Sequence, residues 1–531
     1  MAAVIAAAEL RRRIVARGEI ALLDAREEAS FWESHLLLAS CLPLSRLELL
    51  ASAMLPRKGV PIVVMDNGEG LAERAANRLA EGGWRDLAVL DGGVAAWGAA
   101  GFPLYSGVHV PSKAFAEAVE HECETPSISA EELAERQRRG DDLKIFDSRS
   151  FEEYHSNSIP GATSVPGAEL VYRFADLVPS AETFVVVNCG GRTRSIIGAQ
   201  ALIEAGVPNK VVSLKNGTMA WHLAGLGVVN GATARAPAVS EKGLRLARQR
   251  AEAVARRYGV PTIGRGLLAQ WQDEAEERTL YLLDVRDPAE YRGGHLPGSL
   301  SAPGGQLVQE TDSWLAVWGA RVVLVDDTGV RARMTASWLK RMGWDAVVLD
   351  GGLEGARLEE GMPAADFSDF PLAGPAPAEI EPRALDPKSA IVVDLALSKH
   401  HRAGHVPGAH FAIRARLGEA LAQLPPGSNI VLTSEDGALA RFAAAEAGPK
   451  VAVLKGGTDA WRAAGLALEE GMGRLLSQPD DVALSARDRP PEERERRMRE
   501  YLDWEVDLVN QIARDADCRF TLSPVTGVSA D

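Results

Sequence analysis

Residues 184–195 have the sequence FVVVNCGGRTRS. The apolar run Phe184–Asn188 predicts a buried strand, and the pattern of residues 196–205 predicts a helix. Cys189 is therefore expected at a strand end that faces a helix N-terminus, where backbone N–H groups and the helix dipole favour negative charge. This segment predicts a strand–loop–helix unit of an α/β fold, with a sulfur nucleophile and an anion site at the turn.

The loop after Cys189 carries residue types that suit this chemistry. Gly190 and Gly191 allow the backbone to turn its N–H groups toward the sulfur. Arg192 and Arg194 add positive charge, which is expected to favour the thiolate over the thiol, and their guanidinium groups match the oxygens of an anionic donor. Thr193 lies between them and belongs to the same predicted substrate-binding loop. Ser195 is expected to cap the helix, which stabilises it by ~1 kcal/mol, and to donate to the sulfur.

The unit that contains Cys189 occurs four times. In each copy an apolar strand ends in an aspartate, and these are Asp24, Asp147, Asp284 and Asp394. After a second apolar strand, the turns open with Asp66, Cys189, Asp326 and Ser434, at distances of 42, 42, 42 and 40 residues from the leading aspartate. Such constant spacing indicates an internal repeat. Alternating strands and helices predict α/β domains with mainly parallel sheets, in which ligands bind at the carboxyl ends of strands.

Length and composition narrow the function classes. A chain of 531 residues is too long for one core, and roughly three to five domains are expected. The net charge of −15 argues against nucleic-acid or anionic-membrane partners, and no apolar run approaches the ~20 residues of a membrane span. The Ala-rich start precedes Arg11–Arg13, the reverse of a signal peptide. Four cysteines without a C-x-x-C pair favour neither disulfides nor zinc, so a reducing cytoplasm is expected.

Several motifs together resemble the rhodanese family of sulfurtransferases. They are Asp147-Ser148-Arg149, Ile159–Ala162, Cys189–Ser195 and Asn216-Gly217 with Trp221. The resemblance covers about residues 5–470 as four tandem rhodanese-like domains. It implies that Cys189 takes sulfane sulfur from an anionic donor, thiosulfate or a persulfide, and passes it to a thiophilic acceptor such as cyanide or a thiol. It implies no metal and no cofactor. An oligomer is compatible with the sequence.

The other copies depart from this pattern. Asp66, Asp326 and Ser434 stand where the cysteine would be, and none of them can hold a sulfane sulfur, so these domains are predicted to be inactive. They are expected to shield or position the active cleft. The leading pair Asp147 and Arg149 is interpreted as supporting the loop, since the first and third copies keep the same pair without a cysteine.

The predicted organisation follows from these landmarks. Arg173 is a candidate for the cleft, with a surface role as the alternative, and Cys518 in the tail is a candidate sulfur-relay thiol. The domain boundaries are 1–108 (inactive), 109–232 (catalytic), 233–264 (a helical linker), 265–372 (inactive), 373–475 (inactive) and 476–531 (a helical tail). The tail helix, expected at 492–513, is interpreted mainly as a packing element.

The sequence can be compared with two rival functions. A cysteine phosphatase or arsenate reductase needs an arginine six positions after the cysteine, but that position is Ser195 and the arginine comes one residue earlier, at Arg194. The shorter loop suits one sulfur atom better than a phosphoryl group. A sulfur carrier or scaffold, whose inactive copies bind a partner, stays open at this point.

Overall fold

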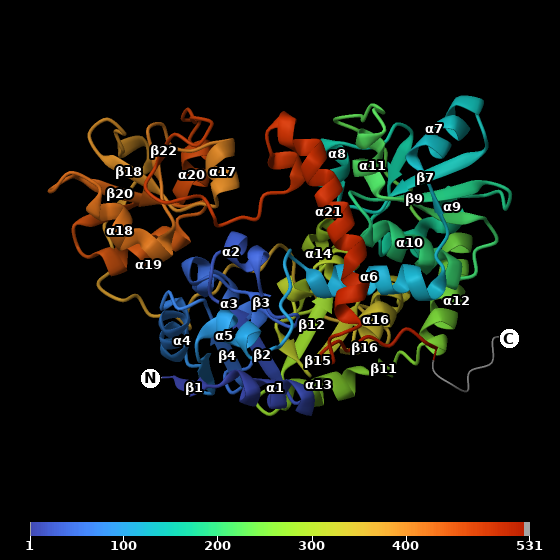
Figure 1. The fold of residues 1–531 in the computed structure, drawn as a ribbon, viewed down its shortest axis with the longest axis horizontal. Coiled ribbons are helices and arrows are strands. Elements are labelled where there is room, and N and C mark those ends of the chain that lie inside the picture. The colour runs from blue at the N-terminus through green and yellow to red at the C-terminus, as the bar shows by residue number, and fades with distance from the viewer. Residues whose placement is uncertain (1, 525–531) are drawn as a thin grey trace.

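The computed structural model describes residues 2–524. It contains four domains, each a mainly parallel sheet flanked by helices, and a long C-terminal helix that crosses the body of the molecule (Figure 1). The predicted fold class is confirmed. Parallel strands are covered by helices on both faces, which is why their sequences are almost continuously apolar.

The first two domains are built from the same alternation of strands and helices. The first domain consists of β1 (Ala3–Ile5), α1 (Ala7–Ala16), β2 (Ile20–Asp24), α2 (Glu28–Glu33), β3 (Ser40–Cys41), η1 (Leu44–Arg46), α3 (Leu47–Met54), β4 (Ile62–Met65), α4 (Leu71–Glu81), β5 (Leu87–Leu90) and α5 (Gly93–Ala99). Helix α6 (Val110–Cys123) leads into the second domain. That domain consists of β6 (Ser127–Ile128), α7 (Ala130–Arg139), β7 (Leu143–Asp147), α8 (Phe151–Ser156), β8 (Ala162–Ser164), α9 (Glu169–Leu177), β9 (Phe184–Asn188), α10 (Thr193–Glu204), β10 (Val211–Leu214) and α11 (Gly217–Leu223).

The third and fourth domains repeat the pattern. The third follows α12 (Glu241–Arg257) and consists of β11 (Thr262–Ile263), α13 (Arg265–Asp273), β12 (Leu280–Asp284), α14 (Pro288–Gly293), β13 (Leu300–Ser301), α15 (Gly304–Gln309), η2 (Thr311–Ser313), β14 (Val317–Trp318), β15 (Arg321–Val325), α16 (Val330–Arg341) and β16 (Asp345–Leu349). The fourth consists of β17 (Glu379–Ile380), η3 (Pro382–Ala384), β18 (Ile391–Asp394), α17 (Ser398–Ala403), β19 (His410–Phe411), η4 (Arg414–Arg416), α18 (Leu417–Ala422), β20 (Ile430–Thr433), α19 (Ala438–Ala447), β21 (Val451–Leu454), α20 (Gly457–Ala463) and β22 (Arg474–Leu475). The tail contains η5 (Ala486–Asp488) and α21 (Pro491–Ile512).

The strand order places the cysteine strand at the centre of its sheet. In the second domain the order is β6-β10-β9-β7-β8, and the other domains share this core arrangement. Asp147, at the end of β7, pairs in register with Asn188, at the end of β9. The leading aspartate and the cysteine loop therefore meet at the carboxyl edge of the sheet, where open α/β sheets bind ligands.

The first three domains share one hydrophobic core. Strand β14 of the third domain pairs antiparallel with β2 of the first, through Val317 and Ala21. The largest cluster of buried apolar side chains runs through these domains and includes Leu508 and Ile512 of α21. The second and third domains each have a further cluster of their own, and the fourth domain has two, although its Phe442 belongs to the shared cluster. The first three domains therefore pack against one another through a shared core rather than forming independent units.

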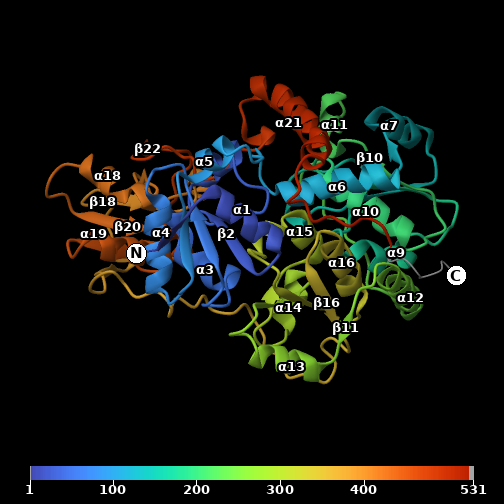
Figure 2. The same ribbon diagram turned by 60° about the horizontal axis from the view of Figure 1, so that its bottom comes forward.

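Two helices outside the repeated units pack against the domains. Helix α12 lies within the predicted helical linker, and one of its faces is buried against the body through Ala247, Ala251 and Val254. Helix α21 contacts α6 and lies beside it in both views (Figures 1 and 2). Within residues 2–524, no helix has the length and apolar character needed to cross a membrane.

Candidate active site

The loop that begins at Cys189 is clamped against the start of α11. The Thr218 N–H donates to the Cys189 carbonyl oxygen at 2.9 Å, and the Met219 N–H donates to the Gly190 carbonyl oxygen at 3.1 Å. This close approach requires Gly217, which has φ 53° and whose Cβ, if present, would lie 2.4 Å from the Cys189 oxygen. Gly93, Gly352 and Gly457 approach the carbonyl oxygens of Asp66, Asp326 and Ser434 in the same way, so contact with the loop explains a glycine at this turn in every repeat.

The thiol of Cys189 is almost fully buried, with 2% of the residue exposed. Its Sγ donates to Ser195 Oγ at 3.5 Å, and that hydroxyl donates to the Arg192 carbonyl oxygen at 2.8 Å. Helix α10 begins at Thr193, with Arg192 at the N-cap position. The prediction that Ser195 caps the helix is therefore wrong, because Ser195 lies within the first turn, where its hydroxyl reaches the sulfur instead.

The electrostatic prediction for the thiol also needs correction. Burial raises the pKa of Cys189 above its ordinary value, although the Arg194 charge and the Ser195 hydroxyl both act to lower it. The nearby carboxylate of Glu505 adds to the increase in pKa. In the free protein, desolvation therefore outweighs the positive charges on which the sequence argument depended.

The backbone N–H groups of the loop are available to a ligand. Among residues 2–524, the N–H groups of residues 190–194 donate no hydrogen bond to another protein group. In the third domain, the Asp326 carboxylate occupies the space in front of the corresponding loop. It accepts from the N–H groups of Gly329 at 2.6 Å and Arg331 at 3.0 Å. Asp66 does the same in the first domain, accepting from Gly68 at 2.9 Å. The loop of the second domain thus keeps open an anion-binding cradle that carboxylates occupy in two other copies.

A cavity of about 200 Å³ lies over the Cys189 loop. Its lining combines three parts of the chain: Glu153, Cys189–Arg194 and Met219 of the second domain, Gln309 of the third, and Ser485, Arg487, Tyr501 and Glu505 of the tail. Ser485 at its rim is exposed. Cys189 therefore lines a polar hollow despite its low exposure, and the hollow is completed by segments outside its own domain.

The two loop arginines are paired with carboxylates. Arg192 Nε donates to Glu117 Oε1 at 2.6 Å, and Glu120 also pairs with this guanidinium, which fastens α6 to the loop. Arg194 Nη2 donates to Glu153 Oε1 at 2.8 Å. Burial alone would raise the pKa of Glu153, but Arg194 holds it at about 2. Both arginines line the cavity, and each is already paired with an acidic partner.

Arg173 is not brought to this cavity. Its Nε donates to Glu169 Oε2 at 2.6 Å and its Nη1 donates to the Pro237 carbonyl oxygen at 2.8 Å. It lines a different hollow, together with Arg235 and Phe151. The prediction that Arg173 binds substrate beside Cys189 is therefore corrected: helix α9 directs it to the linker side of the domain.

The Asp147–Arg149 pair lies beneath the loop. Both side chains are fully buried, and Arg149 Nε donates to Asp147 Oδ1 at 2.8 Å while Nη2 donates to Oδ2 at 2.7 Å. The same bidentate pair forms between Arg286 and Asp284 in the third domain. In the fourth domain, which lacks the arginine, His401 takes the place of that partner beside Asp394.

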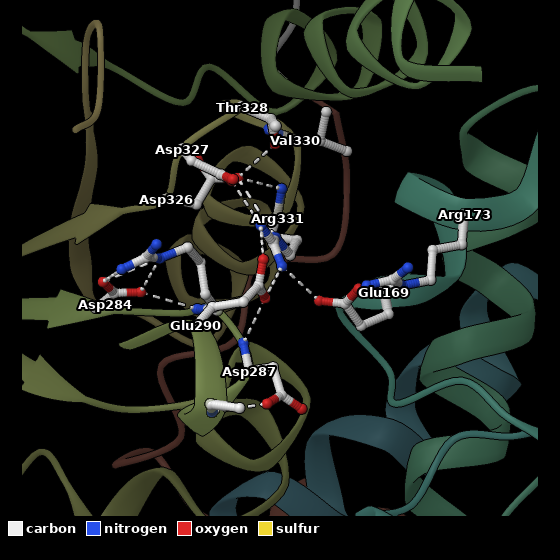
Figure 3. A network of polar contacts seen from close by, with 12 residues as sticks. Glu169, Arg173, Asp284, Asp287, Glu290, Asp326, Asp327, Thr328, Val330 and Arg331 are labelled. Atoms are coloured by element: carbon white, nitrogen blue, oxygen red, sulfur yellow. Dashed lines mark hydrogen bonds and ion pairs between the residues drawn. The ribbon is translucent and has the colours of Figure 1, made fainter. Parts of the chain in front are cut away.

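The corresponding site of the third domain is a charge network around the buried Arg331 that joins two domains (Figure 3). Arg331 is fully buried and its Nη1 donates to Glu290 of its own domain at 2.6 Å and to Glu169 of the second domain at 2.8 Å. Arg331 follows Asp326 by the same five residues that separate Arg194 from Cys189. In the second domain, Arg194 Nη1 donates to Oε1 of Gln306, a residue of the third domain, at 2.8 Å. The loop arginine of each domain thus contacts a side chain of the other domain across their interface.

Sequence reasoning missed the tail residues of the cavity. Thr193 Oγ1 donates to Glu505 Oε1 at 2.7 Å, and Tyr501 lies beside Glu505, whose charge, after burial, raises the pKa of the phenol well above its ordinary value. Glu505 is 1% exposed although it occurs in a strongly charged segment. Its place among the apolar positions of the α21 face, three residues after Leu502 and three before Leu508, was the available signal.

Comparisons with known proteins agree with this architecture. The family model described as "Rhodanese-like domain" matches residues 6–100, 129–224, 267–359 and 378–464. A crystal structure of a thiosulfate sulfurtransferase from Pseudomonas aeruginosa is 48% identical, with a TM-score of 0.93, covering 98% of this chain and 100% of that one. An HTH-type transcriptional regulator of Mycobacterium tuberculosis is 34% identical over 106 residues, 20% of this chain and 46% of the relative. This chain spans about half the length of the curated relatives that it matches.

Proposed function

Because this chain belongs to the rhodanese family, we propose that it is a thiosulfate sulfurtransferase that works through a persulfide on Cys189. The observation that carries the proposal is the open cradle of backbone N–H groups around Cys189, in a polar cavity of about 200 Å³. The related Pseudomonas aeruginosa structure, which carries the name of this activity, extends over nearly the whole chain.

The proposed reaction is a double displacement. The Cys189 thiolate attacks the outer sulfur of thiosulfate, so that a new S–S bond forms on the enzyme while the S–S bond of the donor breaks and sulfite leaves with its electron pair. The acceptor, cyanide or a thiol, then attacks the outer persulfide sulfur and returns the Cys189 thiolate. Two easier steps replace one difficult transfer. The N–H groups of residues 190–194 stabilise the negative charge on sulfur in both steps.

The roles of the surrounding residues follow from this reaction. Gly190 and Gly191 form the cradle, Ser195 forms a hydrogen bond with the Cys189 sulfur, and Arg194 contributes positive charge beside Cys189. Asp147 and Arg149 support the loop from below. The domains with Asp66, Asp326 and Ser434 are proposed to be inactive, and the third positions the second through Gln306 and Arg331. We place the enzyme in a reducing compartment such as the cytoplasm, where the thiol persists.

Mass spectrometry of the intact protein tests the proposal directly. Thiosulfate treatment should add the mass of one sulfur atom to the wild-type protein, and cyanide should remove it. Cys189→Ser should neither gain the mass nor turn over, while Cys41→Ser should behave as wild type. A sulfur gain that persists in Cys189→Ser would reject the mechanism. A persulfide that small acceptors cannot discharge would instead support the sulfur-carrier alternative.

A further inference from the structure

Arg487 differs from the other arginines of the cavity in its partners. Arg192 is paired with Glu117 and Glu120, and Arg194 is paired with Glu153. Among residues 2–524, the Arg487 guanidinium forms no ion pair, although the Glu153 and Asp147 carboxylates act on its charge from a greater distance. Its Nη2 donates to Thr218 Oγ1 at 2.6 Å, a neutral partner. The tail therefore supplies the cavity with a cation whose charge is not compensated by an adjacent carboxylate.

The surroundings of Arg487 make this charge costly to hold without a ligand. The side chain is partly buried, and burial, followed by the neighbouring Arg149, lowers its pKa below the ordinary value. Glu153 and Asp147 act to raise the pKa of Arg487, and Arg194 acts to lower it, so burial and the neighbouring cations prevail. A guanidinium that is desolvated and close to other cations is stabilised by an anion that replaces its lost hydration.

Arg487 is also attached to the cysteine loop through one residue. The same Thr218 that accepts from Arg487 donates its backbone N–H to the Cys189 carbonyl oxygen at 2.9 Å, and its Oγ1 donates to the Gly190 carbonyl oxygen at 3.2 Å. A ligand bound by Arg487 would therefore be held at a fixed position relative to the loop and the Cys189 sulfur.

We infer that Arg487 binds the oxyanion end of the sulfur donor and so sets the donor specificity of the site. Its guanidinium fork matches two oxygens of a sulfonate group, while the outer sulfur of the donor points toward Cys189. This substrate-binding residue lies beyond the last family match, which ends at residue 464, and is supplied by the tail. The inference rests on the proposed function and deepens it by naming a residue that recognises the donor.

Steady-state and single-turnover kinetics with thiosulfate test the inference. Arg487→Gln should raise the KM for thiosulfate by about tenfold or more, the value of a lost charge-assisted hydrogen bond, while kcat at saturation changes much less. The KM of Arg487→Lys should lie between those of wild type and Arg487→Gln. The KM of Arg487→Gln should depend less on ionic strength than that of wild type. Arg489→Gln is the matched control, because Arg489 does not line the cavity. Thermal unfolding of each variant checks the fold.

A binding experiment separates this inference from the proposed function. Calorimetric titration of thiosulfate into Cys189→Ser measures donor binding without chemistry, and Cys189→Ser/Arg487→Gln should bind at least about tenfold more weakly. Equal affinities, or no measurable binding by Cys189→Ser, would overturn the role of Arg487. Absence of a persulfide on the wild-type protein would reject the proposed function instead, whatever the titration shows.

Discussion

At the residue scale, the Cys189 thiol combines burial with a polar neighbourhood. Burial is the largest influence and raises the thiol pKa, while Arg194 and Ser195 act in the opposite direction. The thiolate, which is the reacting form, is therefore a minor species at neutral pH and increases as the pH approaches the raised pKa. We expect the rate of persulfide formation at fixed thiosulfate concentration to rise steadily from about pH 7 to above pH 9. Rapid-quench mass analysis measures it, and a rate independent of pH over that range would contradict the raised pKa.

Glu505 provides a second test at this scale. Its carboxylate raises the pKa of Cys189 and lies over Gly191, whose Cβ position is 3.3 Å from Glu505 Oε2. Glu505→Gln removes the charge but keeps the shape, so the pKa of Cys189 should fall. The pH profile of alkylation by iodoacetamide should then shift to lower pH. Asp503→Asn, on the exposed side of the same helix, is the matched control and should leave the profile in place.

At the element scale, α21 serves both as part of the core and as a wall of the cavity. Leu508 is fully buried in the shared core, whereas Val506, two residues earlier, is 49% exposed. Leu508→Ala should lower the free energy of unfolding by about 2–5 kcal/mol and loosen the helix, which should speed alkylation of Cys189. Val506→Ala should change stability by no more than about 0.5 kcal/mol. Denaturant unfolding and alkylation rates measure both effects, and equal results for the two variants would show that α21 does not enclose the site.

At the scale of the whole molecule, Arg331 links the second and third domains. It is fully buried and pairs with the mostly buried Glu169 and with the more exposed Glu290 and Asp327. Its removal also takes the nearest cation away from the fully buried carboxylate of Asp326. Arg331→Gln should cost about 3–5 kcal/mol of stability. Arg333→Gln is the matched control, since Arg333 is only partly buried and donates to the Gly329 carbonyl oxygen alone. Equilibrium unfolding in urea measures the difference, and matching midpoints for both variants would contradict an interdomain role.

The sequence alone was sufficient for the repeat, the fold class and the cysteine loop. The strand ending in Asp147, the apolar run to Asn188 and the glycine turn at Gly217 are local patterns, and local patterns determine which elements form and in what order. The arginine of each leading pair was likewise expected to support the loop, and Arg149 and Arg286 both form the bidentate contact with their aspartates.

The partners of the charged side chains were decided only by the tertiary structure. Arg192 and Arg194 looked available in the sequence, but they pair with Glu117 and Glu153, which are distant in the chain or lie on another helix. Arg487 and Glu505 reach the cavity across some three hundred residues of intervening chain. Sequence spacing determines periodicity and turns, but desolvation and charge pairing depend on which surfaces meet in space, and those terms set the pKa of Cys189 and the composition of its cavity.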